Sequence, residues 1–180
     1  GEWKRKKPQP EYRRQWRKLH IGIDAETLQI RTVQLTTNNV SDSQVLEDLL
    51  DQIPLDEQID SVYTDGAYDT KHCRKVISDR QAHAVIPPRK NAKPWKDKKL
   101  RSLERNELLK TVKCLGRAIW KKWSGYHRRS LFETKMHRIK LLGDKLSARS
   151  FQSQVNEIHA RVAVLNKFME LGRAHTQVVT

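Results

Sequence analysis

The chain has 180 residues, an ordinary length for one domain, and its 37% hydrophobic content is sufficient for a folded core. Lysine and arginine number 36 against 21 aspartate and glutamate residues, which gives a formal net charge of +15. Such a charge predicts a polyanionic partner, either nucleic acid or an anionic membrane. No apolar run approaches the ~20 residues of a membrane span, and no amino-terminal segment has the apolar centre of a signal peptide. Nucleic acid is therefore the favoured partner.

Cysteine and histidine give no sign of a zinc site. Cys73 and Cys114 lie far apart, with no C-x-x-C pair and no Cys/His cluster at zinc spacing. We expect both to be free thiols in a reducing cytosol. His20, His83 and His159 are expected to be structural or surface residues.

Residues 1–18 form a basic arm in which tryptophans are interleaved with lysine and arginine, and two prolines prevent a regular element. Such a segment suits a phosphate backbone, with rings available for base stacking. A solvated tail explains the same composition. Because Trp16, Arg17 and Lys18 lead directly into a strand, we expect them to be ordered and count them as candidate DNA contacts.

The next part of the chain predicts a hairpin followed by a helix. Apolar alternation over 18–23 and 28–36 indicates two antiparallel strands that are joined by a turn at Asp24. Ser41 or Asp42 caps a helix that runs through residue 52. These elements begin the proposed folded domain, residues 19–172.

Asp65 follows a short predicted strand at 59–64, and a helix from Asp69 or Thr70 to residue 79 leads to another strand at 82–86. Open α/β sheets place their chemistry at the carboxyl ends of strands, because side chains there emerge into a crevice. A turn aspartate before Gly66 is the alternative interpretation.

Residues 89–105 are rich in lysine, surround Pro94 and Trp95, and have no regular apolar period. Lys93, Trp95 and Lys96 are candidate DNA contacts, with a mobile solvated loop as the alternative. Helices are predicted at 107–123, with an interruption at Gly116 and an end before Gly125, and at 149–171. The last helix should pack across the sheet through one apolar stripe, which consists of Val155, Ile158, Val162, Leu165 and Phe168. Residues 173–180 read as a frayed tail.

Four polar residues follow one another at helical spacing near the middle of the second half. Tyr126, Arg129, Glu133 and Lys140 are separated by 3, 4 and 7 positions, which places them on one stripe of a helix that turns ~100° per residue. Arg129 and Glu133 also form an ordinary (i, i+4) ion pair, so the spacing alone leaves the choice open.

The same four residues match the Y-x2-R-x3-E-x6-K signature of insertion-sequence transposases at every spacing. The chain also resembles the insertion-sequence-five group of these transposases, whose catalytic domains are of the insertion-sequence-four type. This wider resemblance extends to about Lys167 and rests on Trp16–His20, Asn38–Asp42, Asp65–Asp69 and Ile86–Lys90.

The resemblance implies a ribonuclease-H-like α/β fold, with a mixed sheet flanked by helices. In that family two Asp and one Glu hold two Mg²⁺ ions, for which Mn²⁺ can substitute, and the ions serve to cut and rejoin DNA. Asp65 and Glu133 match two of these catalytic, metal-binding residues, while Tyr126, Arg129 and Lys140 match residues that serve the DNA around the scissile phosphate.

The family's partners and location carry over as further expectations. They are double-stranded DNA, at transposon ends and at the target, and a second copy of the chain when it is intact. No membrane partner is expected. The implied location is the bacterial cytoplasm, at the nucleoid.

The predicted strand order lacks one element of that fold. Ribonuclease-H-like domains begin with a three-stranded meander whose first strand carries the first catalytic Asp, but only two strands precede the first helix here. We therefore expect the first strand and its carboxylate to lie outside this sequence, and Asp24, at a turn, is not expected to replace it. Without the third carboxylate, catalysis by this chain is an open question.

Three hypotheses follow. The chain is part of a transposase whose whole form cuts and joins DNA, or a non-catalytic DNA-binding remnant of one. The third is a basic binding domain with a chance signature.

Overall fold

The structure is a computed structural model that describes residues 16–172. Its first two strands, β1 (Arg17–Ile23) and β2 (Ile30–Thr37), form the predicted antiparallel hairpin, with Ile21 opposite Val33. Alternating apolar residues place one face of this hairpin in the core. Asp24 is a turn residue as expected, because its Oδ1 accepts the backbone N–H groups of Glu26 at 2.8 Å and Thr27 at 2.7 Å.

The predicted helix after the hairpin forms in two pieces. Ser41 and Gln44 make a capping box at η1 (Asp42–Gln44), a 3₁₀ turn, and α1 (Leu46–Asp51) follows. The chain then enters β3 (Ser61–Tyr63).

A parallel strand pair forms the second sheet, in which β3 pairs with β4 (His83–Val85). The connection contains the 3₁₀ turn η2 (Gly66–Tyr68) and the helix α2 (Lys71–Asp79). Thr70 caps α2 by accepting the N–H of Cys73 at 3.1 Å, as one of the two predicted caps.

Two helices follow the lysine-rich segment: α3 (Leu100–Leu115) and α4 (Arg117–Trp123). The predicted break is confirmed at Gly116, whose φ of +86° favours glycine. The predicted start near residue 107 was wrong, because α3 begins at Leu100 and takes in the end of the segment predicted as loop. Asn106 explains this early start, since its side chain binds both the N–H and the C=O of Trp95.

The signature residues do not share one α-helix, contrary to the prediction. Tyr126 and Arg129 lie in a 3₁₀ turn, η3 (Tyr126–Arg129), and α5 (Ser130–Leu141) begins after it. The left-handed Gly125, at φ +65°, turns the chain out of α4 and into η3.

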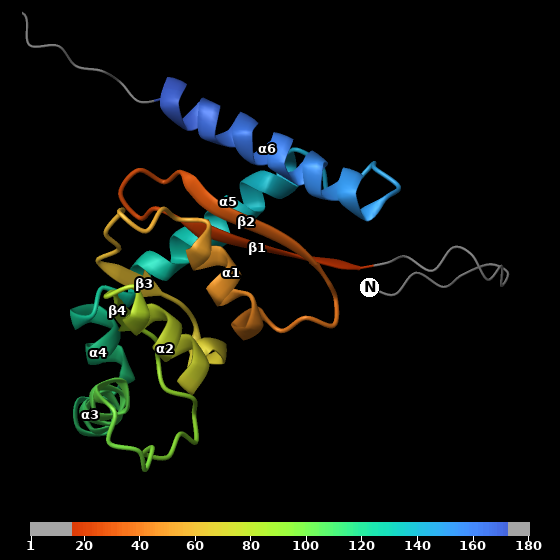
Figure 1. The fold of residues 1–180 in the computed structure, drawn as a ribbon. Coiled ribbons are helices and arrows are strands. Elements are labelled where there is room, and N and C mark those ends of the chain that lie inside the picture. Colours follow the sequence, from red (N-terminus) through yellow and green to blue (C-terminus); the bar gives the residue numbers. More distant parts are fainter. Residues whose placement is uncertain (1–15, 173–180) are drawn as a thin grey trace, which may run out of the picture.

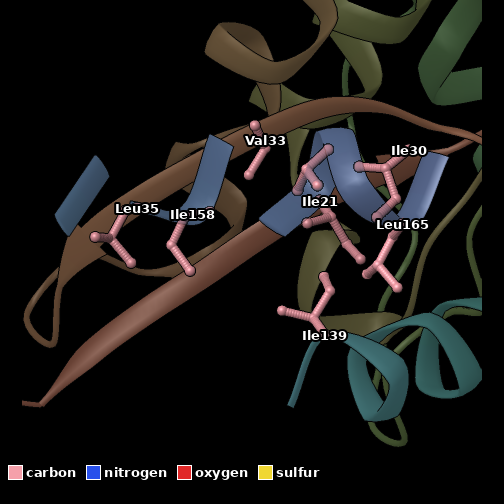
Figure 2. Packing of buried hydrophobic residues seen from close by; sticks show 8 residues of the cluster. Ile21, Ile30, Val33, Leu35, Ile139, Ile158 and Leu165 are labelled. Atoms are coloured by element: carbon pink, nitrogen blue, oxygen red, sulfur yellow. The ribbon is translucent and has the colours of Figure 1, made fainter. Parts of the chain in front are cut away.

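The long last helix, α6 (Phe151–Leu171), covers the β1–β2 sheet as predicted (Figure 1). Its Ile158, Val162 and Leu165 join the core of the hairpin, together with Ile139 of α5 (Figure 2). Phe168 was also predicted on the buried stripe, but 62% of it is exposed because it lies one turn beyond Leu165.

The class is α/β, as expected, but the described residues form two separate two-stranded sheets and not one mixed sheet. A second core lies between α1, α2 and the β3–β4 pair; its buried residues are Leu46, Leu50, Cys73, Val76, Ile77 and Ile86. Cys73 and Cys114 are free thiols, as predicted. Within residues 16–172 no helix is long and apolar enough to cross a bilayer.

Candidate active site

Asp65 lies directly beyond the end of β3, where the sequence placed it. The last pairing contact of the sheet is the N–H of Thr64, which donates to the carbonyl of Val85 at 3.3 Å. Asp65 then caps η2, since its Oδ1 accepts the N–H of Ala67 at 2.8 Å. The cap uses one carboxylate oxygen, and the side chain stays 39% exposed. The other oxygen, Oδ2, is directed toward η3.

Arg129 joins the two predicted catalytic carboxylates. Its Nη2 lies 3.5 Å from Asp65 Oδ2, and its Nη1 forms an ion pair with Glu133 Oε1. The expected (i, i+4) pair is therefore present, but the same guanidinium also reaches across to the end of β3. The fold thus brings together Asp65 and Glu133, which no local sequence pattern connects.

The two carboxylates fit a hard divalent cation in kind, because Mg²⁺ and Mn²⁺ prefer oxygen ligands. They do not complete a site: within residues 16–172 no group of three or more His, Cys, Asp or Glu side chains is placed to hold a metal ion. A guanidinium also occupies the space between them. The arrangement therefore suits two ligands of a partial metal site.

Tyr126 is held beside this pair by aromatic and cationic neighbours. Its ring centroid lies 5.6 Å from that of Trp120, and Nζ of Lys121 lies 5.2 Å above the ring. Burial raises the pKa of the phenol, an effect that the nearby Arg129 opposes and Asp65 reinforces. Tyr126 therefore remains protonated near neutral pH and can donate a hydrogen bond.

A shallow hollow of about 460 Å³ lies against these residues, and it is lined by Lys121, Lys122, Tyr126, His127, Arg129, Ser130 and Glu133. Sequence reasoning missed Lys121 and Lys122, because they read as the polar side of an ordinary helix. Their one signal was their position just before Gly125, which turns the chain back toward the signature residues.

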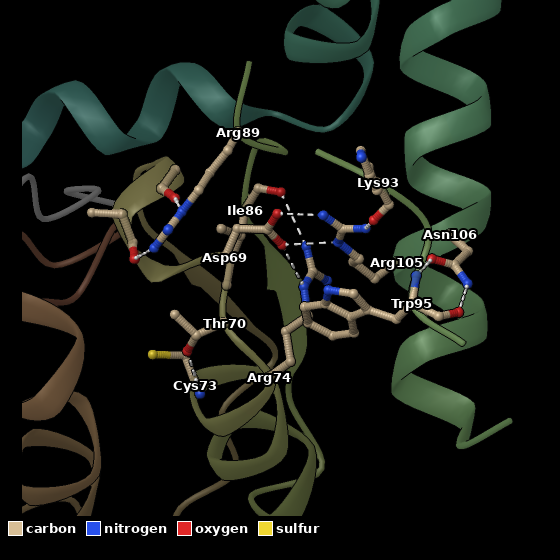
Figure 3. Close-up of polar contacts among 12 residues, drawn as sticks. Asp69, Thr70, Cys73, Arg74, Ile86, Arg89, Lys93, Trp95, Arg105 and Asn106 are labelled. Carbon is tan, nitrogen blue, oxygen red and sulfur yellow. Dashed lines mark hydrogen bonds and ion pairs between the residues drawn. The ribbon is translucent and has the colours of Figure 1, made fainter. Parts of the chain in front are cut away.

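Fixed charges hold the turn that carries Asp65 (Figure 3). Arg89 donates from Nε to the carbonyl of Gly66 at 3.2 Å and from Nη2 to that of Ala67 at 3.0 Å. At the end of η2 lies Asp69, whose carboxylate is fully buried. These contacts restrict where the Asp65 carboxylate can point.

Asp69 binds two arginines, which are themselves buried. Arg74 Nε lies 3.1 Å from its Oδ1, and Arg105 Nη2 lies 2.9 Å from its Oδ2. Arg105 also donates from Nη1 to the carbonyl of Lys93 at 2.6 Å, which ties the lysine-rich segment to the same centre. Sequence reasoning missed this network. Its one signal was that Asp69 ends the DGAYD run, one of the stretches on which the family resemblance rests.

The predicted contacts of the lysine-rich segment have different environments. Lys93 and Lys96 are exposed, whereas the Trp95 ring is half-buried and lies under two protein cations. The guanidinium carbon of Arg105 is 4.6 Å from the ring centroid and Nζ of Lys71 is 5.8 Å from it.

The arm residues lie elsewhere. In Figure 1 the start of β1 is at the far end of the hairpin from β3 and β4. Arg17 donates to Gln154 at 3.1 Å and lies 5.0 Å from the Phe151 ring centroid, while Lys18 donates to the carbonyl of Val40 at 2.9 Å. Trp16 is 70% exposed. The remaining arm, residues 1–15, lies outside the described residues, as does the predicted frayed tail.

Lys140 is exposed on α5, two turns beyond Glu133, or about 10 Å along the axis. The site therefore gathers Asp65, Tyr126, Arg129 and Glu133 closely and Lys140 at a distance. The residues at the start of β1 form a separate surface.

No solved structure matches the chain. The sequence does match the family model described as Transposase DDE domain, over residues 1–167. That match takes in both carboxylates, the guanidinium between them and the whole of the two sheets. The chain therefore belongs to the DDE transposase family.

Proposed function

We propose that this transposase chain binds double-stranded DNA over the surface around Arg129 and that Asp65 and Glu133 are its metal-binding catalytic carboxylates. The observation that carries the proposal is the convergence of Asp65 and Glu133 on one guanidinium. Around this convergence the exposed charge is basic, and the whole chain carries +15, which suits a phosphate backbone. We assign the chain to the insertion-sequence-five group, acting as a homodimer on transposon ends and target DNA at the nucleoid.

Asp65 and Glu133 would hold Mg²⁺, or Mn²⁺ in its place. Two such metal ions, when bound, would supply an activated attacking hydroxyl and would stabilise the leaving oxygen during phosphoryl transfer. The chain's own residues position the DNA. Arg129 has a planar fork of donors that matches a phosphate. Tyr126 can donate its phenol proton to a phosphate oxygen, and Lys140 adds charge along the flanking backbone.

Arg129 has two competing roles in this scheme. While it pairs with both carboxylates, it offsets one of their two negative charges, and its own positive charge opposes the entry of a cation. A DNA phosphate offers the guanidinium an alternative partner and would release both carboxylates. We infer that DNA binding and metal binding favour each other through Arg129.

A second candidate function, DNA binding without cleavage, is favoured by the absence of a third carboxylate beside this pair in residues 16–172. The two candidates differ in one assay. If the chain binds DNA without cleaving it, the 180-residue chain should cut a duplex in Mg²⁺ no faster than the background rate. Robust cleavage that is lost in Asp24→Asn would instead assign the third carboxylate to Asp24.

DNA binding is tested by salt titration of the affinity for a duplex. Counterion release predicts that log K falls with log salt by ~0.9 per phosphate contact. Changing Lys121 and Lys122 together to Gln should flatten the slope by up to about 1.8, whereas Lys75→Gln, on α2, should leave it unchanged. A slope near zero in the unchanged chain would refute the electrostatic part of the proposal.

Metal binding is tested by Mn²⁺ titration, read by paramagnetic relaxation of solvent water. We expect weak binding to the unchanged chain, none in Glu133→Gln or Asp65→Asn, and tighter binding in Arg129→Gln, because the competing guanidinium is gone. Glu133→Gln should keep most of its DNA affinity, which comes from lysine and arginine. Equal Mn²⁺ affinity in all four proteins would remove Asp65 and Glu133 from the site.

A further inference from the structure

The chain leaves β4 through a short segment, residues 86–89, that lies against the turn carrying Asp65. We call it the proline segment. Its Pro88 is fully buried, and two successive prolines fix the φ angles and supply no N–H donors. The approach to the turn is close, because a Cβ added at Gly66 would lie 3.3 Å from the carbonyl oxygen of Pro87. The proline segment is therefore a rigid support beside Asp65.

Arginine side chains bind the carbonyls of the proline segment. Arg74 of α2 donates from Nη2 to the carbonyl of Ile86 at 3.2 Å. Arg117 donates from Nη2 to the carbonyl of Pro88 at 2.7 Å. Because Arg117 is the first residue of α4, this second bond ties the proline segment to the helix that leads into η3.

Arg89 extends the same chain of contacts to the Asp65 turn (Figure 3). Its guanidinium donates to the carbonyls of Gly66 and Ala67. The N–H of Ala67 in turn donates to Asp65 Oδ1 at 2.8 Å. The peptide groups between the Arg89 guanidinium and the Asp65 carboxylate are thus held by directed bonds at each step.

Arg117 lies at the other end of this chain of contacts, near Tyr126. Burial raises the pKa of the Tyr126 phenol, and the charge of Arg117 opposes this rise, which indicates that the two side chains are neighbours. Trp120, one turn further along α4, packs on Tyr126 with 5.6 Å between the ring centroids. The helix that Arg117 anchors therefore sets where η3 begins, and η3 carries Arg129.

We propose that Arg89 and Arg117 are positioning residues, which fix the Asp65 carboxylate relative to η3 through the proline segment. The contact between Asp65 and Arg129 joins two elements that are distant in the sequence, and this chain of contacts connects the same two elements. Both arginines donate to backbone carbonyls, so their bonds orient the backbone. The proposal rests on the metal-binding role given above to Asp65 and Glu133.

Positioning and simple charge predict opposite effects on metal binding. A guanidinium that acts only through its charge repels a cation, so its removal should tighten Mn²⁺ binding. Removal of a residue that orients a metal ligand typically lowers metal affinity about 10–100-fold. Because Arg89 and Arg117 are exposed, variants at both positions should remain folded.

The first test is Mn²⁺ titration of the 180-residue chain, read by paramagnetic relaxation of solvent water. We expect Arg89→Gln to bind Mn²⁺ at least about tenfold more weakly than the unchanged chain. Arg117→Gln should weaken binding less, because it acts through one further contact. Arg31→Gln, which removes a guanidinium paired with Glu57, is the matched control and should leave the affinity unchanged. Unchanged or tighter binding in Arg89→Gln would overturn the proposal.

Amide hydrogen exchange tests the positioning without metal. The N–H of Ala67 should exchange at least about threefold faster in Arg89→Gln, because two hydrogen bonds that hold its turn are lost. Methylguanidinium added to Arg89→Ala should slow this exchange again. The N–H of Cys73, which Thr70 caps, is the internal control and should not change.

The exchange experiment also separates this proposal from the proposed metal site. Unchanged exchange at Ala67 in Arg89→Gln would refute the positioning role. Faster exchange at Ala67, together with no Mn²⁺ binding by the unchanged chain, would support positioning and refute only the metal role of Asp65 and Glu133.

Discussion

The two sheets of this transposase are held in place by different interactions. The β1–β2 sheet is clamped by apolar side chains of α5 and α6, such as Ile139 and Ile158. The β3–β4 sheet has its own apolar core, but the turn that leaves it is fixed by the buried charges of Asp69, Arg74 and Arg105. Apolar packing sets how layers lie against each other, whereas directed ion pairs set where one loop runs. Asp65, which we propose as a catalytic residue, lies in the loop that the ion pairs fix.

The two kinds of contact also fail differently. Truncating one buried apolar side chain to Ala costs about 2–5 kcal/mol, and the cost depends on how far the surrounding side chains close the cavity. Removal of one partner from a buried ion pair costs about 3–5 kcal/mol, because the remaining charge is left uncompensated. The buried ion pairs should therefore lose stability even when a substitution keeps the shape of the side chain, whereas the apolar contacts lose it through lost volume.

The largest effect is expected from Asp69→Asn. The change keeps the shape of the side chain but leaves Arg74 and Arg105, which are 4% and 3% exposed, without a carboxylate. We expect the free energy of unfolding to fall by about 3–5 kcal/mol in urea titrations. Asp79→Asn, which breaks the exposed pair of Asp79 with Lys75, should cost less than about 1 kcal/mol. Similar losses in the two variants would show that burial does not govern the difference.

The apolar packing around the β1–β2 sheet was largely predictable from the sequence. Periodicity reports which face of an element is buried, and it located both strands of the hairpin and the stripe Ile158, Val162 and Leu165. Local signals also worked: Thr70 caps α2, and Gly116 and Gly125 break the chain where predicted. The predicted burial of Phe168 was wrong, because periodicity does not reveal where the surface that a helix packs against ends.

The ion pairs around Asp69 could not be predicted from the sequence in the same way. Asp69 pairs with Arg105 across 36 positions, and no local pattern identifies such a partner. Arg129 illustrates both cases: its pair with Glu133 follows from helical spacing, whereas its contact with Asp65 depends on how η3 meets β3. The early start of α3 has the same origin, since Asn106 anchors it through the distant Trp95.

An intermediate effect is expected on the apolar side from Asn166→Ala. Asn166 satisfies both backbone groups of Ile30 at the start of β2, so its loss leaves a donor and an acceptor without these partners. We expect a loss of about 1–3 kcal/mol, measured by thermal and urea unfolding. Asn156→Ala, on the same helix, is the matched control and should change stability little, because Asn156 is exposed and accepts a hydrogen bond from the exposed Gln152. Equal effects would mean that solvent replaces Asn166 at the strand edge.

The smallest effect concerns pH, where the two sides should differ in kind. Arginine stays charged at all working pH values, so the network around Asp69 contributes no change through its guanidinium groups. The hairpin contains His20, which is 4% exposed and contacts Thr36 Oγ1 through Nε2 at 2.9 Å. Burial lowers the pKa of His20 below its usual 6.5, although Asp42 partly opposes this.

The lowered pKa of His20 fixes whether stability rises or falls with pH. A histidine whose folded pKa is lowered contributes its stability above pH 6.5, and it loses this contribution as pH falls from 6.5 to the folded pKa, because the unfolded chain takes up the proton first. The midpoint of thermal unfolding should therefore drop between about pH 7.5 and about pH 5, and the drop should be smaller in His20→Gln. His159→Gln, which changes an exposed histidine on α6, should keep the full drop. If the His20 variant retained the same pH dependence as the unchanged chain, the buried imidazole would not be its source.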